Sequence, residues 1–80
     1  MKDLSIYTGP QCHLCDQAKK ILLPLLSARG WKLIEKNIQG KAALIDAYGL
    51  RIPVVVFPSG REKGWPFTSA QIVTLLDREL

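Results

Sequence analysis

The sequence predicts an α/β fold in which helices flank a four-stranded mixed sheet. The first supporting observation is the order of its apolar-patterned segments, which is β-α-β-α-β-β-α. The second is the β-branched run at residues 54–57, because a run without alternation is typical of a central strand covered on both faces. The third is the composition, since 80 residues with 48% hydrophobic and 22% charged side chains suit a single globular domain, residues 1–80.

The first half of the chain predicts a strand, a helix and a second strand. Apolar and polar residues alternate over residues 3–7, which indicates a strand, and a loop at residues 8–11 follows it. We expect a helix from about His13 toward Ala28, which Pro24 should kink or end because proline removes an intrahelical hydrogen bond. A second strand is expected at residues 31–37. Two strands joined by a helix should be parallel and connected with a right-handed crossover.

The second half predicts a short helix, two paired strands and a last helix. The short helix should begin at Gly40, run through Tyr48 and end at Gly49 in a left-handed cap. A turn at residues 58–60 should join the central strand to an edge strand at residues 61–65. Thr68 and Gln71 have the spacing of a capping box, which places the start of the final helix.

Both cysteines of the chain, Cys12 and Cys15, lie three residues apart at the predicted start of the first helix. The unpaired N–H groups and the dipole of a helix start stabilise a thiolate, and they lower a cysteine pKa by about one to several units from about 8.5. Cys12 is therefore the candidate nucleophile. Cys15 borders the apolar stripe of the helix, so we expect its sulfur to be partly covered, as suits a resolving thiol. The residues of this stripe are Leu14, Ala18, Ile21, Leu22 and Leu25.

Other interpretations of the cysteine pair compete with redox chemistry. A closed zinc site normally needs four ligands in two separated half-sites, whereas this chain has one cysteine pair and one histidine, so we expect no metal. A purely structural disulfide would close too small a loop to remove much unfolded-state entropy. The two cysteines could also be unrelated and buried. His13 either stabilises a thiolate and protonates a leaving thiol, or is simply exposed to solvent.

The charge pattern argues against nucleic-acid and membrane partners. The chain has a net charge of +4, but its basic residues are scattered instead of forming a patch interleaved with aromatic residues. No apolar stretch approaches the roughly 18 residues that a membrane span requires, and no signal-peptide pattern is present. We therefore expect a monomer in the reducing cytoplasm. In that compartment a cysteine pair is more often catalytic than permanently bridged.

With its motifs in this order, the chain resembles the thioredoxin superfamily, and within it a small glutaredoxin-like protein. The resemblance covers nearly the whole chain and rests on the C-x-x-C at the first strand–helix junction, on Ile52-Pro53 before the third strand, and on the order of elements. Three motifs also match a group of short bacterial glutaredoxin-like proteins: Cys-His-Leu-Cys at 12–15, Tyr-Gly-Leu-Arg-Ile-Pro at 48–53 and Trp-Pro-Phe at 65–67. The resemblance implies a thioredoxin-like sheet of order 2-1-3-4.

The resemblance implies a thiol–disulfide oxidoreductase in which Cys12 attacks and Cys15 resolves, and which reduces protein or glutathione mixed disulfides. It also implies that Pro53 is cis and lies against the cysteines, so that the backbone of Ile52 can pair with an extended substrate. An ordinary trans proline that starts a strand is the alternative for Pro53. The alternative for the whole protein is a noncatalytic binding module of the same fold, with its thiols serving as a redox sensor.

Two further residues are candidates for substrate contact. Arg51 could hold a substrate carboxylate, and Trp65 could line the surface around Cys12. Glutathione is a candidate co-substrate, although residues 64–68 read Gly-Trp-Pro-Phe-Thr where glutaredoxins carry a Gly-Gly-x-Asp segment that grips it. The W-C-G-P-C motif of thioredoxin is also absent. We expect no tightly bound cofactor, and the reductant stays unidentified.

Overall fold

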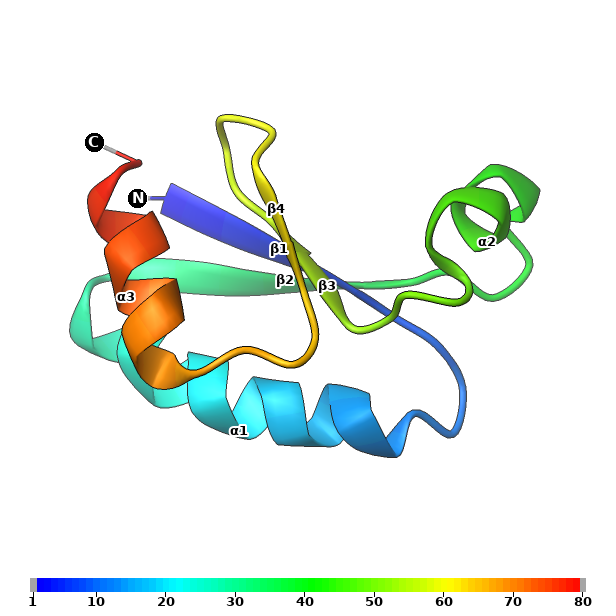
Figure 1. Cartoon of the computed structure of the whole chain (residues 1–80), viewed down its shortest axis with the longest axis horizontal. Coiled ribbons are helices and arrows are strands. Elements are labelled where there is room, and N and C mark those ends of the chain that lie inside the picture. The colour runs from blue at the N-terminus through cyan, green and yellow to red at the C-terminus, as the bar shows by residue number, and fades with distance from the viewer. Residues whose placement is uncertain (1, 80) are drawn as a thin grey trace.

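The computed structural model describes residues 2–79, in which three helices pack on a four-stranded sheet of order β2-β1-β3-β4 (Figure 1). The elements are β1 (Lys2–Thr8), α1 (His13–Ala28), β2 (Trp31–Asn37), α2 (Ala42–Tyr48), β3 (Val54–Val56), β4 (Glu62–Gly64) and α3 (Ser69–Asp77). β1 is parallel to β2 and antiparallel to β3, and β3 is antiparallel to β4. The predicted α/β fold with a mixed sheet of order 2-1-3-4 is confirmed.

The core lies on one face of this sheet, because successive side chains of a strand point to opposite faces. On β1, Leu4, Ile6 and Thr8 are buried, whereas Ser5 and Tyr7 are half-buried on the other face. Helices α1 and α3 contact each other and cover the core face (Figure 1). Their buried contributions are Ala18, Leu22, Leu26, Ile72 and Leu76.

Helix α2 lies on the other side of the sheet and buries none of its own residues (Figure 1). It is attached through a stack of rings and cations, in which the Tyr48 ring lies 4.4 Å from the Tyr7 ring. Lys36 Nζ lies 5.9 Å from the centre of the Tyr7 ring, and the Arg51 guanidinium lies 5.4 Å from that of Tyr48. The Tyr48 hydroxyl and Arg51 both donate hydrogen bonds to Glu62, at 2.6 and 3.1 Å. The contacts of Tyr48 connect α2 to β1 and β4.

One local prediction about helix ends is wrong, the left-handed cap at Gly49. Helix α1 extends to Ala28 as expected, so Pro24 does not end it, and Leu22 and Leu26 are buried on either side of the proline. Gly49 is not a left-handed cap, because its φ of −54° and ψ of −34° continue the right-handed turn. A side chain at Gly49 would instead put its Cβ 2.5 Å from the carbonyl oxygen of Ile45, so glycine is required there by close approach.

The other boundaries agree with the predictions to within two residues, and α2 begins at Ala42 instead of Gly40. The capping box of α3 is confirmed, since Thr68 Oγ1 accepts from the Gln71 N–H at 3.2 Å and Gln71 Oε1 accepts from the Thr68 N–H at 3.0 Å. Within residues 2–79, none of the helices combines the length and the apolar character needed to cross a membrane.

Glu79 connects the end of α3 to the turn between β3 and β4. Its carboxylate, with only 2% of the side chain exposed, accepts hydrogen bonds from the Ser59 N–H at 3.0 Å and the Ser59 hydroxyl at 2.6 Å. The Arg61 guanidinium nitrogen Nη1 lies 3.7 Å from Glu79 Oε2. The hydrogen bonds from Ser59 lower the pKa of Glu79 from its usual value, and the charges of Arg61 and Lys2 add to this effect, although burial opposes it.

We expect Glu79 to contribute to acid sensitivity. Because its folded-state pKa lies below its unfolded-state value, the stabilisation is complete above the unfolded pKa and is lost as pH falls through the folded pKa. Glu79→Gln should therefore destabilise the fold by about 1.5 to 3 kcal/mol near neutral pH, the usual contribution of hydrogen bonds to a charged group, and by less at about pH 3. Urea unfolding of both proteins at the two pH values measures the difference. An equal loss at both values would contradict this role.

Candidate active site

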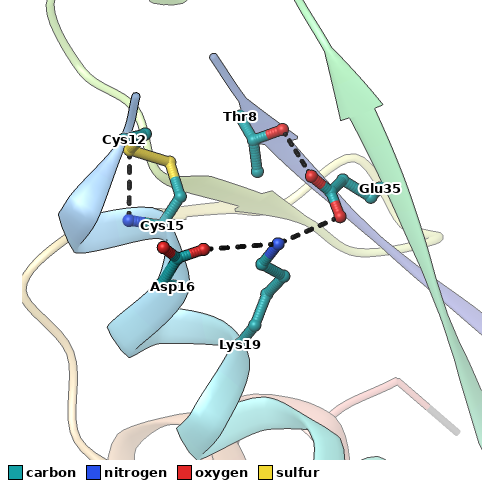
Figure 2. The surroundings of a disulfide bond; sticks show 6 residues. All are labelled: Thr8, Cys12, Cys15, Asp16, Lys19 and Glu35. Carbon is teal, nitrogen blue, oxygen red and sulfur yellow. Dashed lines mark hydrogen bonds and ion pairs between the residues drawn. A yellow bond between two sulfur atoms is a disulfide. The ribbon is translucent and has the colours of Figure 1, made fainter. Parts of the chain in front are cut away.

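The chain turns from β1 into α1 so that Cys12 caps the helix. Cys12 has the extended backbone of an N-cap residue, with φ −94° and ψ 93°, and its Sγ accepts the Cys15 N–H at 3.1 Å (Figure 2). This is the bond that a capping side chain makes to one of the unpaired N–H groups of a first helical turn. The Cys12 sulfur therefore lies where backbone N–H groups and the helix dipole favour a negative charge.

The two cysteines form a disulfide but differ in burial. Cys12 is bonded to Cys15 with a Cα–Cα distance of 5.2 Å, and Cys12 is half-buried whereas Cys15 is 2% exposed. The covering of Cys15 agrees with its predicted position beside the apolar stripe of α1. Leu14 departs from that prediction, because it is 44% exposed and points away from the core that Ala18 and Leu22 enter.

The segment Ile52-Pro53 lies against the loop that precedes Cys12. A Cβ on Gly9 would come within 2.8 Å of Ile52 Cδ1, so the loop and the Ile52 side chain are packed closely. The Ile52–Pro53 peptide bond is cis, and the Pro53 carbonyl accepts the Trp65 N–H at 3.1 Å. The Ile52 N–H already donates to the Tyr48 carbonyl at 3.1 Å. No described backbone N–H donates to the Ile52 carbonyl.

An open depression of about 380 Å³ borders the disulfide on the side facing β2. Its lining includes both cysteines and His13, which is exposed. The lining also contains three charged side chains, Asp16, Lys19 and Glu35.

Lys19 lies between the two carboxylates of the depression (Figure 2). Its Nζ is 3.2 Å from Glu35 and 3.6 Å from Asp16, and Glu35 also accepts the hydroxyl of buried Thr8 at 3.0 Å. The hydrogen bond to Glu35 raises the pKa of Lys19, with burial opposing and the charges of Glu35 and Asp16 adding to the rise. Lys19 is therefore charged at neutral pH.

Glu35 and Thr8 were missed by sequence reasoning. They come from β2 and β1, whose parallel register pairs Ile6 with Glu35, so they meet the start of α1 only when the sheet forms. One signal was available, because Lys19 follows Cys15 by four residues and so shares its face of the helix. An acidic residue on the adjacent parallel strand was the natural partner for that lysine.

The remaining candidates, Arg51 and Trp65, are not among the residues that line the depression. Arg51 lies over the Tyr48 ring and is paired with Glu62. The Trp65 ring packs edge-on against Phe67, with centroids 5.0 Å apart, and contacts the core.

The sequence matches one protein family over nearly the whole described chain. The family described as glutaredoxin-like domain (DUF836) matches residues 3–77. The chain belongs to this family. The resemblance drawn from the C-x-x-C and the order of elements is thereby confirmed for this glutaredoxin-like domain.

Solved structures of one other protein share the fold of this glutaredoxin-like domain. The X-ray structure of the Northeast Structural Genomics target protein XcR50 from X. campestris is 43% identical, covers 94% of this chain and 96% of its own, and has a TM-score of 0.81. The solution structure of that target is 42% identical, covers 98% and 95%, and has a TM-score of 0.79. No curated protein matches the chain.

Proposed function

We propose that this glutaredoxin-like domain is a thiol–disulfide oxidoreductase with Cys12 as the nucleophile and Cys15 as the resolving thiol. The asymmetry of the two cysteines supports this assignment. Cys12 caps α1 through its Sγ and is half-buried, whereas Cys15 is 2% exposed. An incoming disulfide therefore meets Cys12 first, and Cys15 can be reached only from within the protein.

The proposed reaction starts from the reduced protein. The Cys12 thiolate attacks one sulfur of the substrate disulfide, a bond from Cys12 to that sulfur forms, and the other substrate sulfur leaves as a thiolate that takes a proton. The Cys15 thiol then loses its proton and attacks Cys12 Sγ, which releases the second substrate thiol. The protein ends as the Cys12–Cys15 disulfide, and two electrons have passed to the substrate. A dithiol or two molecules of a monothiol must restore the reduced protein.

The residues around the sulfurs suggest further roles. His13 lies at the exposed edge of the depression, beside the position that a leaving thiolate would occupy, and we assign it the protonation of that thiolate. The Ile52 carbonyl, which accepts no backbone hydrogen bond from the described residues, would accept an N–H from a substrate in extended conformation. The substrate is a disulfide-containing protein or a glutathione mixed disulfide in the reducing cytoplasm.

Titration of Cys12 tests the proposal most directly. In the Cys15→Ser variant Cys12 is the sole thiol, and its thiolate absorbs in the ultraviolet, so the pKa can be measured without a label. Because backbone N–H groups of α1 face the sulfur, we expect a pKa below the reference of about 8.5. A value at or above that reference, together with no reduction of a model disulfide by the native protein, would favour a noncatalytic binding module.

Turnover assays name the reductant. The oxidised protein is supplied with a model disulfide and either reduced glutathione or thioredoxin reductase, each with its own NADPH-coupled readout. Turnover with one of them identifies the source of electrons. The reduced protein could also reduce the model disulfide once without being regenerated by either glutathione or thioredoxin reductase. That result would leave the dithiol chemistry intact and require another thiol reductant.

A further inference from the structure

The charged groups beside the disulfide bear on which substrates the proposed oxidoreductase accepts. We infer that Asp16 and Glu35 are specificity-determining residues, which favour disulfides flanked by cationic or neutral groups and disfavour anionic ones such as glutathione disulfide. The inference rests on the proposed function, since it concerns the same two cysteines.

The first argument is the balance of charge in the depression. Two carboxylates, Asp16 and Glu35, and one ammonium, Lys19, line it together with the cysteines, which leaves one net negative charge among these three groups. The chain as a whole carries +4, so the negative sign is a local property of this site.

The second argument is which of these groups a substrate meets. The side chain of Lys19 is 28% exposed, whereas those of Asp16 and Glu35 are 67% and 46% exposed. The ammonium lies between the carboxylates and makes its contacts with them (Figure 2). A substrate that approaches Cys12 therefore encounters the carboxylate oxygens more than the ammonium.

The third argument concerns Arg51, the cation that precedes the Ile52-Pro53 segment. Its guanidinium donates to Glu62 at 3.1 Å and lies over the Tyr48 ring, on the sheet face opposite α1. Both Lys19 and Arg51 are thus already paired with carboxylates. Glutathione disulfide, whose halves each carry net negative charge, would have to displace one of these ion pairs to gain Lys19 or Arg51 as a cationic partner.

The test uses three small disulfides that differ in charge: cationic cystamine, neutral 2-hydroxyethyl disulfide and anionic dithiodiglycolate. Native protein is reduced with dithiothreitol and desalted, and its single-turnover oxidation is followed by acid quench, alkylation and mass measurement. Each rate constant is divided by that of the neutral disulfide. This division cancels any change in the reactivity of the Cys12 thiolate itself, which would affect all three substrates alike.

Removing one carboxylate should lower the rate ratio for the cationic disulfide and raise the rate ratio for the anionic disulfide. Two unit charges about 6 Å apart in water alter a rate constant roughly threefold. In Asp16→Asn and in Glu35→Gln, the cystamine ratio should therefore fall about threefold and the dithiodiglycolate ratio rise about threefold. The effect should be largest at about 0.01 M ionic strength and vanish near 1 M, where the Debye length is about 3 Å. Glutathione disulfide should follow the anionic substrate.

The matched control is Asp3→Asn, which removes the same charge from an exposed side chain at the other end of β1. Its ratios should equal those of the native protein. Ratios unchanged in both site variants, or shifted equally in the control, would overturn the inference while leaving the oxidoreductase intact. A native protein that reacts with none of the three disulfides would instead overturn the proposed function. His13, which also lines the depression, is the same in every comparison.

Discussion

Cys12→Ser should abolish disulfide reduction, with a loss of at least about 10³-fold, because a serine hydroxyl is not ionised at neutral pH and does not attack sulfur. The loss of activity should be specific to Cys12 because of where its sulfur lies. Cys12 is the half-buried cysteine whose Sγ accepts the N–H of residue 15, whereas Cys15 is only 2% exposed and is too covered to replace it. Single-turnover reduction of a model disulfide, with the protein reduced beforehand, measures the loss.

The companion variant Cys15→Ser separates the two roles. It should still be attacked once by substrate and then accumulate a stable mixed disulfide, visible as an added mass that dithiothreitol removes. Trapping through Cys15 in the Cys12→Ser variant, with none through Cys12, would reverse the assignment. Circular dichroism of both variants in the reduced state checks that the fold is retained.

Leu22→Ala should destabilise the domain by about 2 to 5 kcal/mol, because the removed methyl groups leave a cavity in the core. Leu22 is fully buried on α1 and belongs to the cluster that joins α1, α3 and the sheet. A domain of 80 residues has a core that supplies only about 3 to 5 kcal/mol. The variant should therefore be largely unfolded, as urea titration followed by circular dichroism would show.

The neighbouring residue provides a matched control for this substitution. Leu23 is on the same helix but is 53% exposed, so Leu23→Ala changes helix propensity equally without opening a cavity. Its effect should stay within about 0.5 kcal/mol. Equal losses in the two variants would mean that the helix, and not the core beneath it, limits the stability.

The features that the sequence predicts well depend on neighbouring residues. Alternation over β1, the helical period after Cys12 and the β-branched run of β3 each specify an element locally, and the right-handed crossover rule then makes β1 and β2 parallel. The position of Cys12 at the start of α1 follows from the same local pattern. For this reason the sequence alone predicts the fold and the position of the two cysteines in it.

The features that escaped prediction depend on contacts between distant segments. The sequence left open whether Pro24 kinks or ends α1, and the helix continues past it with Leu22 and Leu26 buried on either side. Glu35 reaches the depression only through the register of β2 against β1. The pairing of Arg51 with Glu62 from β4 likewise depends on the folded chain. The spatial positions of Glu35 and Glu62 are not specified by spacing along the chain.

The weak attachment of α2 makes it the part of the domain most able to unfold locally. With no residue of its own in the core, α2 is held by the Tyr7–Tyr48 stack and the contacts to Glu62, so it can open while the remaining sheet and α1 stay folded. Such an opening would release one side of the peptide that leads to Pro53. The segment before Pro53 could then rearrange without global unfolding of the domain.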